Sequence, residues 1–95
     1  MDLNPAHIVT VTDFSRETLR NVIAHLEVST DFEHLVYRES ELDAIWSITG
    51  FALKSDGDPA QREALAKLHQ GAHQAHDLVA DRRPAQAAAL LRRFL

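Results

Sequence analysis

Residues 42–53 constrain the fold of this 95-residue chain more than any other segment. As an α-helix with about 100° per residue, this segment is apolar on nearly every side. A helix of that kind is stable only when most of its surface is buried. The rest of so short a chain can cover only part of it, because one small domain has a thin core and often gains stability by pairing.

The uncovered part of this helix is therefore expected to contact a second subunit, another partner or an apolar ligand. We favour burial in a homodimer, because symmetric dimers are the commonest oligomers. Two alternatives stay open: complete burial within one monomer, and a ligand pocket lined by Trp46 and Phe51. The predicted interface residues are Leu42, Ile45, Trp46, Ile48, Phe51 and Leu53.

Capping and turn residues divide the chain into further helices. Asp13 or Ser15 can cap the first helix, and Thr30 with Glu33 forms a capping box for the second. The turn-forming residues 54–58 end the second helix, and Pro59 suits the first position of the third. The segment Arg82-Arg83-Pro84 interrupts the chain again before a short terminal helix. The predicted helices span residues 13–28, 30–54, 59–81 and 84–94.

Residues 7–12 are β-branched and partly alternating, which is typical of a strand or an extended segment. Because no other segment offers a partner strand, we predict that residues 1–12 form an extended arm. Ser40 with Asp43 offers a second capping pattern, so residues 38–41 can alternatively break the second helix; we favour a continuous one. The expected fold is a single all-α domain, residues 1–95, forming a dimeric antiparallel bundle of three to four helices.

Composition excludes several classes of protein. The chain has no cysteine, so disulfides and thiolate metal sites are absent, which fits a reducing compartment. Residues 1–5 do not resemble the start of a secretory signal, and the longest apolar run is too short to span a bilayer. We therefore expect no membrane association and a cytoplasmic location. The excess of arginine over lysine and the many alanines indicate a GC-rich bacterial genome.

Charge is distributed unevenly along the chain. The net charge is −4, with three basic against nine acidic residues in residues 1–53 and seven against five in residues 54–95. Arginine pairs stand at residues 82–83 and 92–93. We expect these pairs to serve packing and ion pairing rather than phosphate contacts, because the chain as a whole repels nucleic acid.

Three histidines, His69, His73 and His76, have spacings of four and three and so lie on one helix face, with Asp77 beside them. Two histidines one turn apart can ligate zinc, and a third donor would come from another helix or subunit, with His7, His25 and His34 as the reservoir. Gln70 stands where a zincin motif requires glutamate, which excludes that protease class. A pH-sensitive interface and ordinary boundary histidines are the other interpretations.

No enzyme signature is present in the sequence. A glycine-rich phosphate loop and a Gly-x-Ser-x-Gly elbow are both missing, and the chain has three glycines in total. The sequence therefore predicts no catalytic residues and no cofactor, apart from the zinc hypothesis at the histidines. We expect a small non-enzymatic protein-interaction or regulatory module that acts as a homo-oligomer. The alternatives are a histidine-based metal-binding protein and a nucleic-acid-associated regulator.

Overall fold

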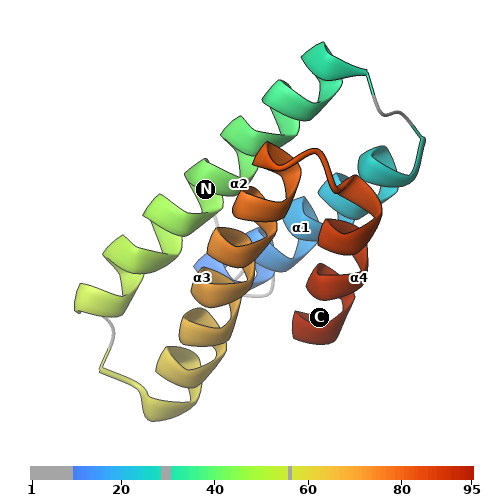
Figure 1. The fold of residues 1–95 in the computed structure, drawn as a ribbon. Coiled ribbons are helices and arrows are strands. Elements are labelled where there is room, and N and C mark those ends of the chain that lie inside the picture. The colour runs from blue at the N-terminus through green and yellow to red at the C-terminus, as the bar shows by residue number, and fades with distance from the viewer. Residues whose placement is uncertain (1–9, 29–30, 56) are drawn as a thin grey trace, which may run out of the picture.

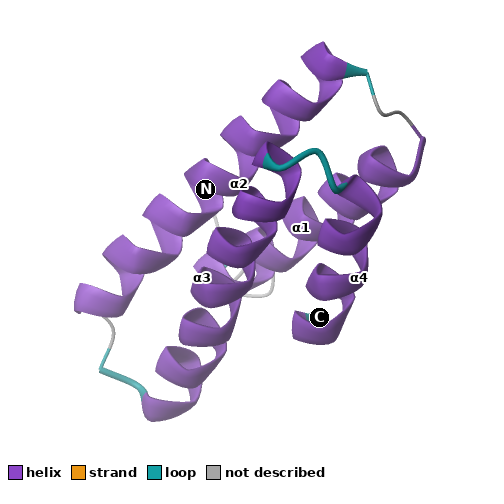
Figure 2. Cartoon of the chain, in the orientation of Figure 1, coloured by secondary structure: helices purple, strands orange, loops and turns teal. Residues whose placement is uncertain are grey.

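The computed structural model describes residues 10–28, 31–55 and 57–95, and these residues form four α-helices. The helices are α1 (Val11–Val28), α2 (Phe32–Ser55), α3 (Pro59–Ala80) and α4 (Pro84–Phe94). Successive helices run in opposite directions (Figure 1), and the described part of the chain contains no strand (Figure 2). The expected all-α class is confirmed.

The helices are arranged so that α2 and α4 lie on opposite sides of the molecule. Each of them packs against both α1 and α3, and α2 makes its most extensive contact with α3 (Figure 1). The two differ in length, since α2 has 24 residues and α4 has 11. At 1.5 Å per residue α2 is about 36 Å long. One side of this long helix therefore faces away from the other three.

The core runs between the four helices and is built mostly from leucine, valine and alanine. Small residues of α3 let its neighbours approach closely: a Cβ added to the buried Gly71 would lie 2.9 Å from Cγ of Phe94. The ring of Phe94 thereby fixes α4 against the α3 backbone. The core consists of Leu19, Val22, Ile23 and Leu26 of α1, Leu35, Leu42 and Ile45 of α2, Leu68, Ala72, Ala75 and Val79 of α3, and Ala87, Ala88 and Leu91 of α4.

The start of α1 differs from the prediction. Val11 and Thr12 are helical rather than extended, and residues 1–9 of the predicted arm lie outside the described residues. The cap is Thr10, whose hydroxyl oxygen accepts a hydrogen bond from the Asp13 amide at 3.0 Å. Asp13 and Ser15, the two predicted caps, do not cap the helix, because α1 begins at Val11 and both residues lie inside it. Burial also favours helix at Thr12, whose hydroxyl donates to Oε1 of Gln61 at 2.8 Å.

The other helix boundaries follow local signals. Thr30 lies outside the described residues, and α2 begins at Phe32 and runs through residues 38–41 without a break. Asp58 caps α3, since its carboxylate accepts a hydrogen bond from the Ala60 amide at 3.3 Å. The turn after α3 is closed by Arg82 in the left-handed region, with φ of 60°. Pro84 then opens α4 at the predicted residue.

A search of the described residues finds no helix that is both long enough and apolar enough to cross a membrane.

Candidate interaction surface

The apolar segment of α2 is divided between the inside and the outside of the monomer. Leu42 and Ile45 are buried in the monomer's own core, which removes them from the predicted outer interface. Leu53 is half-buried. The other three predicted interface residues are exposed: 40% of Trp46, 37% of Ile48 and 77% of Phe51 are accessible to solvent. One chain therefore covers about half of the segment, and the large side chains on the other half remain in water.

These exposed side chains belong to a stretch of α2 that carries no charge. Between Asp43 and Lys54 every residue is neutral, and both of these charged residues are exposed. We define the apolar face of α2 as the exposed residues between them on the side of the helix that Asp43 and Lys54 share. Its members are Trp46, Ser47 and Phe51, whereas the exposed Ile48 lies on the other flank, about 160° from Trp46. An exposed apolar surface of adjoining residues, bordered by charged groups, is typical of a protein interaction site.

The Trp46 ring is held in place by two histidines of α3. His69 stacks on it, with ring centroids 5.4 Å apart and the planes 17° apart, and His73 lies tilted with its centroid at 5.8 Å. Nδ1 of His69 is 2.9 Å from the Trp46 carbonyl oxygen and 3.0 Å from Oγ1 of Thr49. Because a carbonyl oxygen only accepts, Nδ1 of His69 is the donor in its contact with Trp46.

Thr49 and Gly50 support this arrangement from the α2 side. The Thr49 hydroxyl donates to the Ile45 carbonyl oxygen at 2.7 Å and can still accept from His69. A Cβ on Gly50 would lie 3.0 Å from Cε1 of His69, so the imidazole rests directly on the helix backbone. Beside it lies an open hollow of about 400 Å³, lined by Trp46, Ser47, Gly50, Phe51, Leu53, Lys54 and His69.

The three histidines of the zinc hypothesis are brought to one side of α3. A second hollow of about 180 Å³ is lined by Asp43, Trp46, His73, His76 and Asp77. Nδ1 of His76 is 3.7 Å from Oδ1 of Asp77. Within residues 10–28, 31–55 and 57–95, no three histidine, cysteine, aspartate or glutamate side chains are grouped so that they could hold a metal ion. The zinc site therefore stays a prediction that requires a further donor.

The suggested further donors are placed as follows. His25 of α1 and His34 of α2 have ring centroids 6.2 Å apart, and His7 lies outside the described residues.

Two of the paired arginines make contacts within the chain: Arg92 is ion-paired with Glu27, and the Arg82 guanidinium lies 4.6 Å from the centroid of the Phe32 ring. These contacts are of the packing and ion-pairing kind expected from the sequence.

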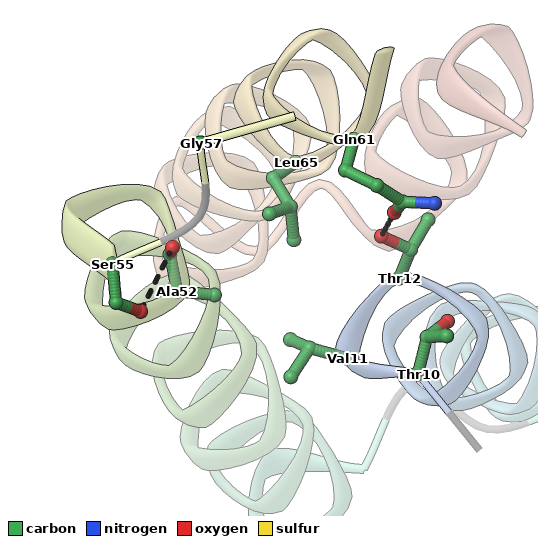
Figure 3. A pocket seen from close by; sticks show the side chains of 8 residues that line it. All are labelled: Thr10, Val11, Thr12, Ala52, Ser55, Gly57, Gln61 and Leu65. Atoms are coloured by element: carbon green, nitrogen blue, oxygen red, sulfur yellow. Dashed lines mark hydrogen bonds between the residues drawn. The ribbon is translucent and has the colours of Figure 1, made fainter. Parts of the chain in front are cut away.

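A separate cleft of about 480 Å³ opens where α1 begins, α2 ends and α3 begins (Figure 3). Figure 3 shows the Thr12 hydrogen bond to Gln61 on one side and the Ser55 hydroxyl bonded to the Ala52 carbonyl oxygen on the other. The lining residues are Thr10, Val11, Thr12, Ala52, Ser55, Gly57, Gln61 and Leu65. None of these described lining residues has an ionisable side chain, so they supply no general acid or base.

Sequence reasoning did not single out Thr49 and Gly50 as supports for His69. The relation between Thr49 and Ile45, one helical turn apart, is visible in the sequence. The contact between Thr49 and His69, however, joins residues 20 positions apart on two helices. It depends on how α2 and α3 pack, which no local pattern specifies.

Comparisons with known protein families, with curated proteins and with solved structures find no match for this chain. What can be said of its function therefore follows from the arrangement of its own residues.

Proposed function

We propose that this protein is a non-enzymatic helical interaction module that associates with a second copy of itself through the apolar face of α2. The observation that carries the proposal is the exposure of Trp46 and Phe51 on one side of an uncharged stretch of α2. Leaving a large apolar side chain in water forfeits about 1.5–3 kcal/mol relative to burying it. A partner that covers Trp46 and Phe51 would recover the share of that free energy that belongs to their exposed fractions, 40% and 77%.

A second copy suits this surface better than a highly charged partner. The residues from Ala44 to Leu53 carry no charge, so two copies can face each other there without like-charge repulsion. A symmetric contact also uses the same patch on both subunits, so it requires no complementary patch elsewhere on the molecule. Binding of a different protein to the same face is the competing outcome.

The test is the mass of the protein in solution and its response to a charge on the apolar face. We expect sedimentation equilibrium at micromolar concentration to give the mass of a dimer. Phe51→Asp should give a folded monomer, because a carboxylate at the centre of an apolar contact is costly to bury. The matched control is Phe14→Asp on α1, where the ring is 48% exposed outside the apolar face; it should remain dimeric.

Two results would contradict the proposal. A wild-type protein with monomer mass throughout the micromolar range would exclude self-association. If Phe51→Asp and Phe14→Asp both sediment as monomers, and circular dichroism shows that both are folded, the contact lies elsewhere than on α2.

A further inference from the structure

We propose that the two copies pack α2 against α2 in antiparallel directions. The two copies would be related by a two-fold axis that is perpendicular to α2 and lies level with the midpoint between Ile48 and Thr49. This inference rests on the proposed self-association and adds its geometry. The observation behind it concerns the exposed side of α2. Residues that stand at equal distances before and after that midpoint are suited to contact each other.

One stripe of residues carries the first part of the argument. Asp43, Ser47, Gly50 and Lys54 follow each other at intervals of four, three and four, which places them within about 60° of arc on the helix surface. Asp43 and Lys54 are equally far from the midpoint, and so are Ser47 and Gly50. In an antiparallel pair, Asp43 of each copy would therefore lie opposite the partner's Lys54, and Ser47 opposite the partner's Gly50.

The aromatic residues obey the same symmetry. Trp46 and Phe51 are also equally far from the midpoint, so each Phe51 would lie opposite the partner's Trp46. The open hollow of about 400 Å³ between Trp46, Gly50 and His69 is on this side of the helix, and the stacked His69 ring holds Trp46 at its edge. The small side chain of Ser47 would let the partner helix approach beside the hollow, so that the most exposed ring, Phe51, could enter the partner's hollow.

The charges at the two ends of the stripe favour this direction over a parallel one. A parallel pair would put Asp43 beside the partner's Asp43 and Lys54 beside the partner's Lys54, which is repulsive at both ends. Both side chains are exposed, so the pairs would select the orientation more than they would add affinity.

Charge reversal tests the orientation. Asp43→Lys and Lys54→Asp each create two like-charge contacts in the antiparallel dimer, and each should raise the dissociation constant about tenfold at low salt. The double variant Asp43→Lys/Lys54→Asp restores both ion pairs and should return the dissociation constant to within about twofold of wild type. In a parallel dimer like charges already meet, so none of the three variants would weaken it.

Cross-linking gives an independent measurement, because the chain contains no cysteine. In the antiparallel pair, two copies of Ser47→Cys are offset along the helix by about 4.5 Å, whereas two copies of Ser40→Cys are offset by about 25 Å. Both serines are exposed. A short thiol-reactive cross-linker should therefore join Ser47→Cys rapidly and Ser40→Cys not at all.

The outcomes separate this inference from the proposed function. If the wild type is a dimer but the single charge variants bind as tightly as it does, or Ser40→Cys cross-links as fast as Ser47→Cys, the antiparallel geometry is wrong and self-association stands. If the wild type is a monomer, both fail. Thermal unfolding of each variant shows whether a loss of dimer reflects loss of the fold.

Discussion

At the scale of single residues, two completely buried side-chain hydroxyl groups, of Ser15 and Thr49, differ in whether they have hydrogen-bond partners. Oγ of Ser15 has no hydrogen-bond partner among the described residues, whereas Oγ1 of Thr49 contacts the Ile45 carbonyl oxygen and Nδ1 of His69. A buried polar group without a partner is destabilising, and one inside a network stabilises the contacts around it. Ser15 therefore lowers the stability of α1, while Thr49 joins α2 to α3.

Replacing these two residues should change stability in opposite directions. Ser15→Ala should raise the free energy of unfolding by up to about 1 kcal/mol, because it removes an unpaired hydroxyl and improves helix propensity. The nearly isosteric Thr49→Val should lower it by about 1–2 kcal/mol, because it removes a buried hydrogen-bonding group between α2 and α3. Urea unfolding followed by Trp46 fluorescence measures both. A Ser15→Ala variant as unstable as Thr49→Val would mean that the Ser15 hydroxyl has a partner after all.

At the scale of the helix, the buried side of α2 contains an arginine where its periodicity calls for an apolar residue. The series is Leu35, Arg38, Leu42, Ile45 and Thr49. The Arg38 residue is only 7% exposed; its Nε lies 2.9 Å from Oε1 of Glu41, and its guanidinium lies 4.9 Å from the centroid of the Tyr37 ring. The Nε–H group of Arg38 does not point at Oε1 of Glu41. Among the described residues, neither Nε of Arg38 nor Oε1 of Glu41 has a hydrogen-bond partner. The contact is therefore an ion pair without a hydrogen bond.

An ion pair of this kind is more costly to break than to replace. Glu41→Ala should lower the free energy of unfolding by about 1–2 kcal/mol, because it leaves the buried guanidinium without its counter-charge. Arg38→Met, which keeps an unbranched apolar stem and removes the charge, should be neutral or stabilising. Thermal unfolding of the two variants checks the order. A larger loss of stability in Arg38→Met than in Glu41→Ala would contradict this order.

The helices illustrate what the sequence alone can predict. Pro59 and Pro84 determine helix starts through their own backbone restrictions, and α3 and α4 begin at these residues. The beginning of α1 escaped prediction because β-branched Val11 and Thr12 favour strand locally, whereas the Thr10 cap and the bond between Thr12 and Gln61 favour helix. The apolar segment of α2 was recognised, but its division into Leu42 and Ile45 inside and Phe51 outside depends on where α1 and α3 pack.

At the scale of the whole molecule, the order of the helices around the bundle explains why one face is left uncovered. Because α2 and α4 are each flanked by α1 and α3, α4 cannot reach the outer side of α2 (Figure 1). Any contact partner of the apolar face would therefore come from outside these four helices. A dimer built through α2 would place both copies of α4 on the far sides of the assembly.

The close contact between Gly71 and Phe94 has a consequence for the order in which the chain folds. A helix of 11 residues is too short to persist alone in water, so α4 forms only when Phe94 and its neighbours are seated on α3 and α1. We expect native-state hydrogen exchange to show α4 opening at a lower free energy than α1, α2 and α3, as a separate cooperative unit. Gly71→Ala, whose methyl group displaces the Phe94 ring, should speed exchange in α4 while leaving the other helices protected. A uniform increase in the exchange rates of all four helices would mean instead that the bundle opens as one unit. If α4 opens first, the molecule spends part of its time as a three-helix protein whose last segment is undocked.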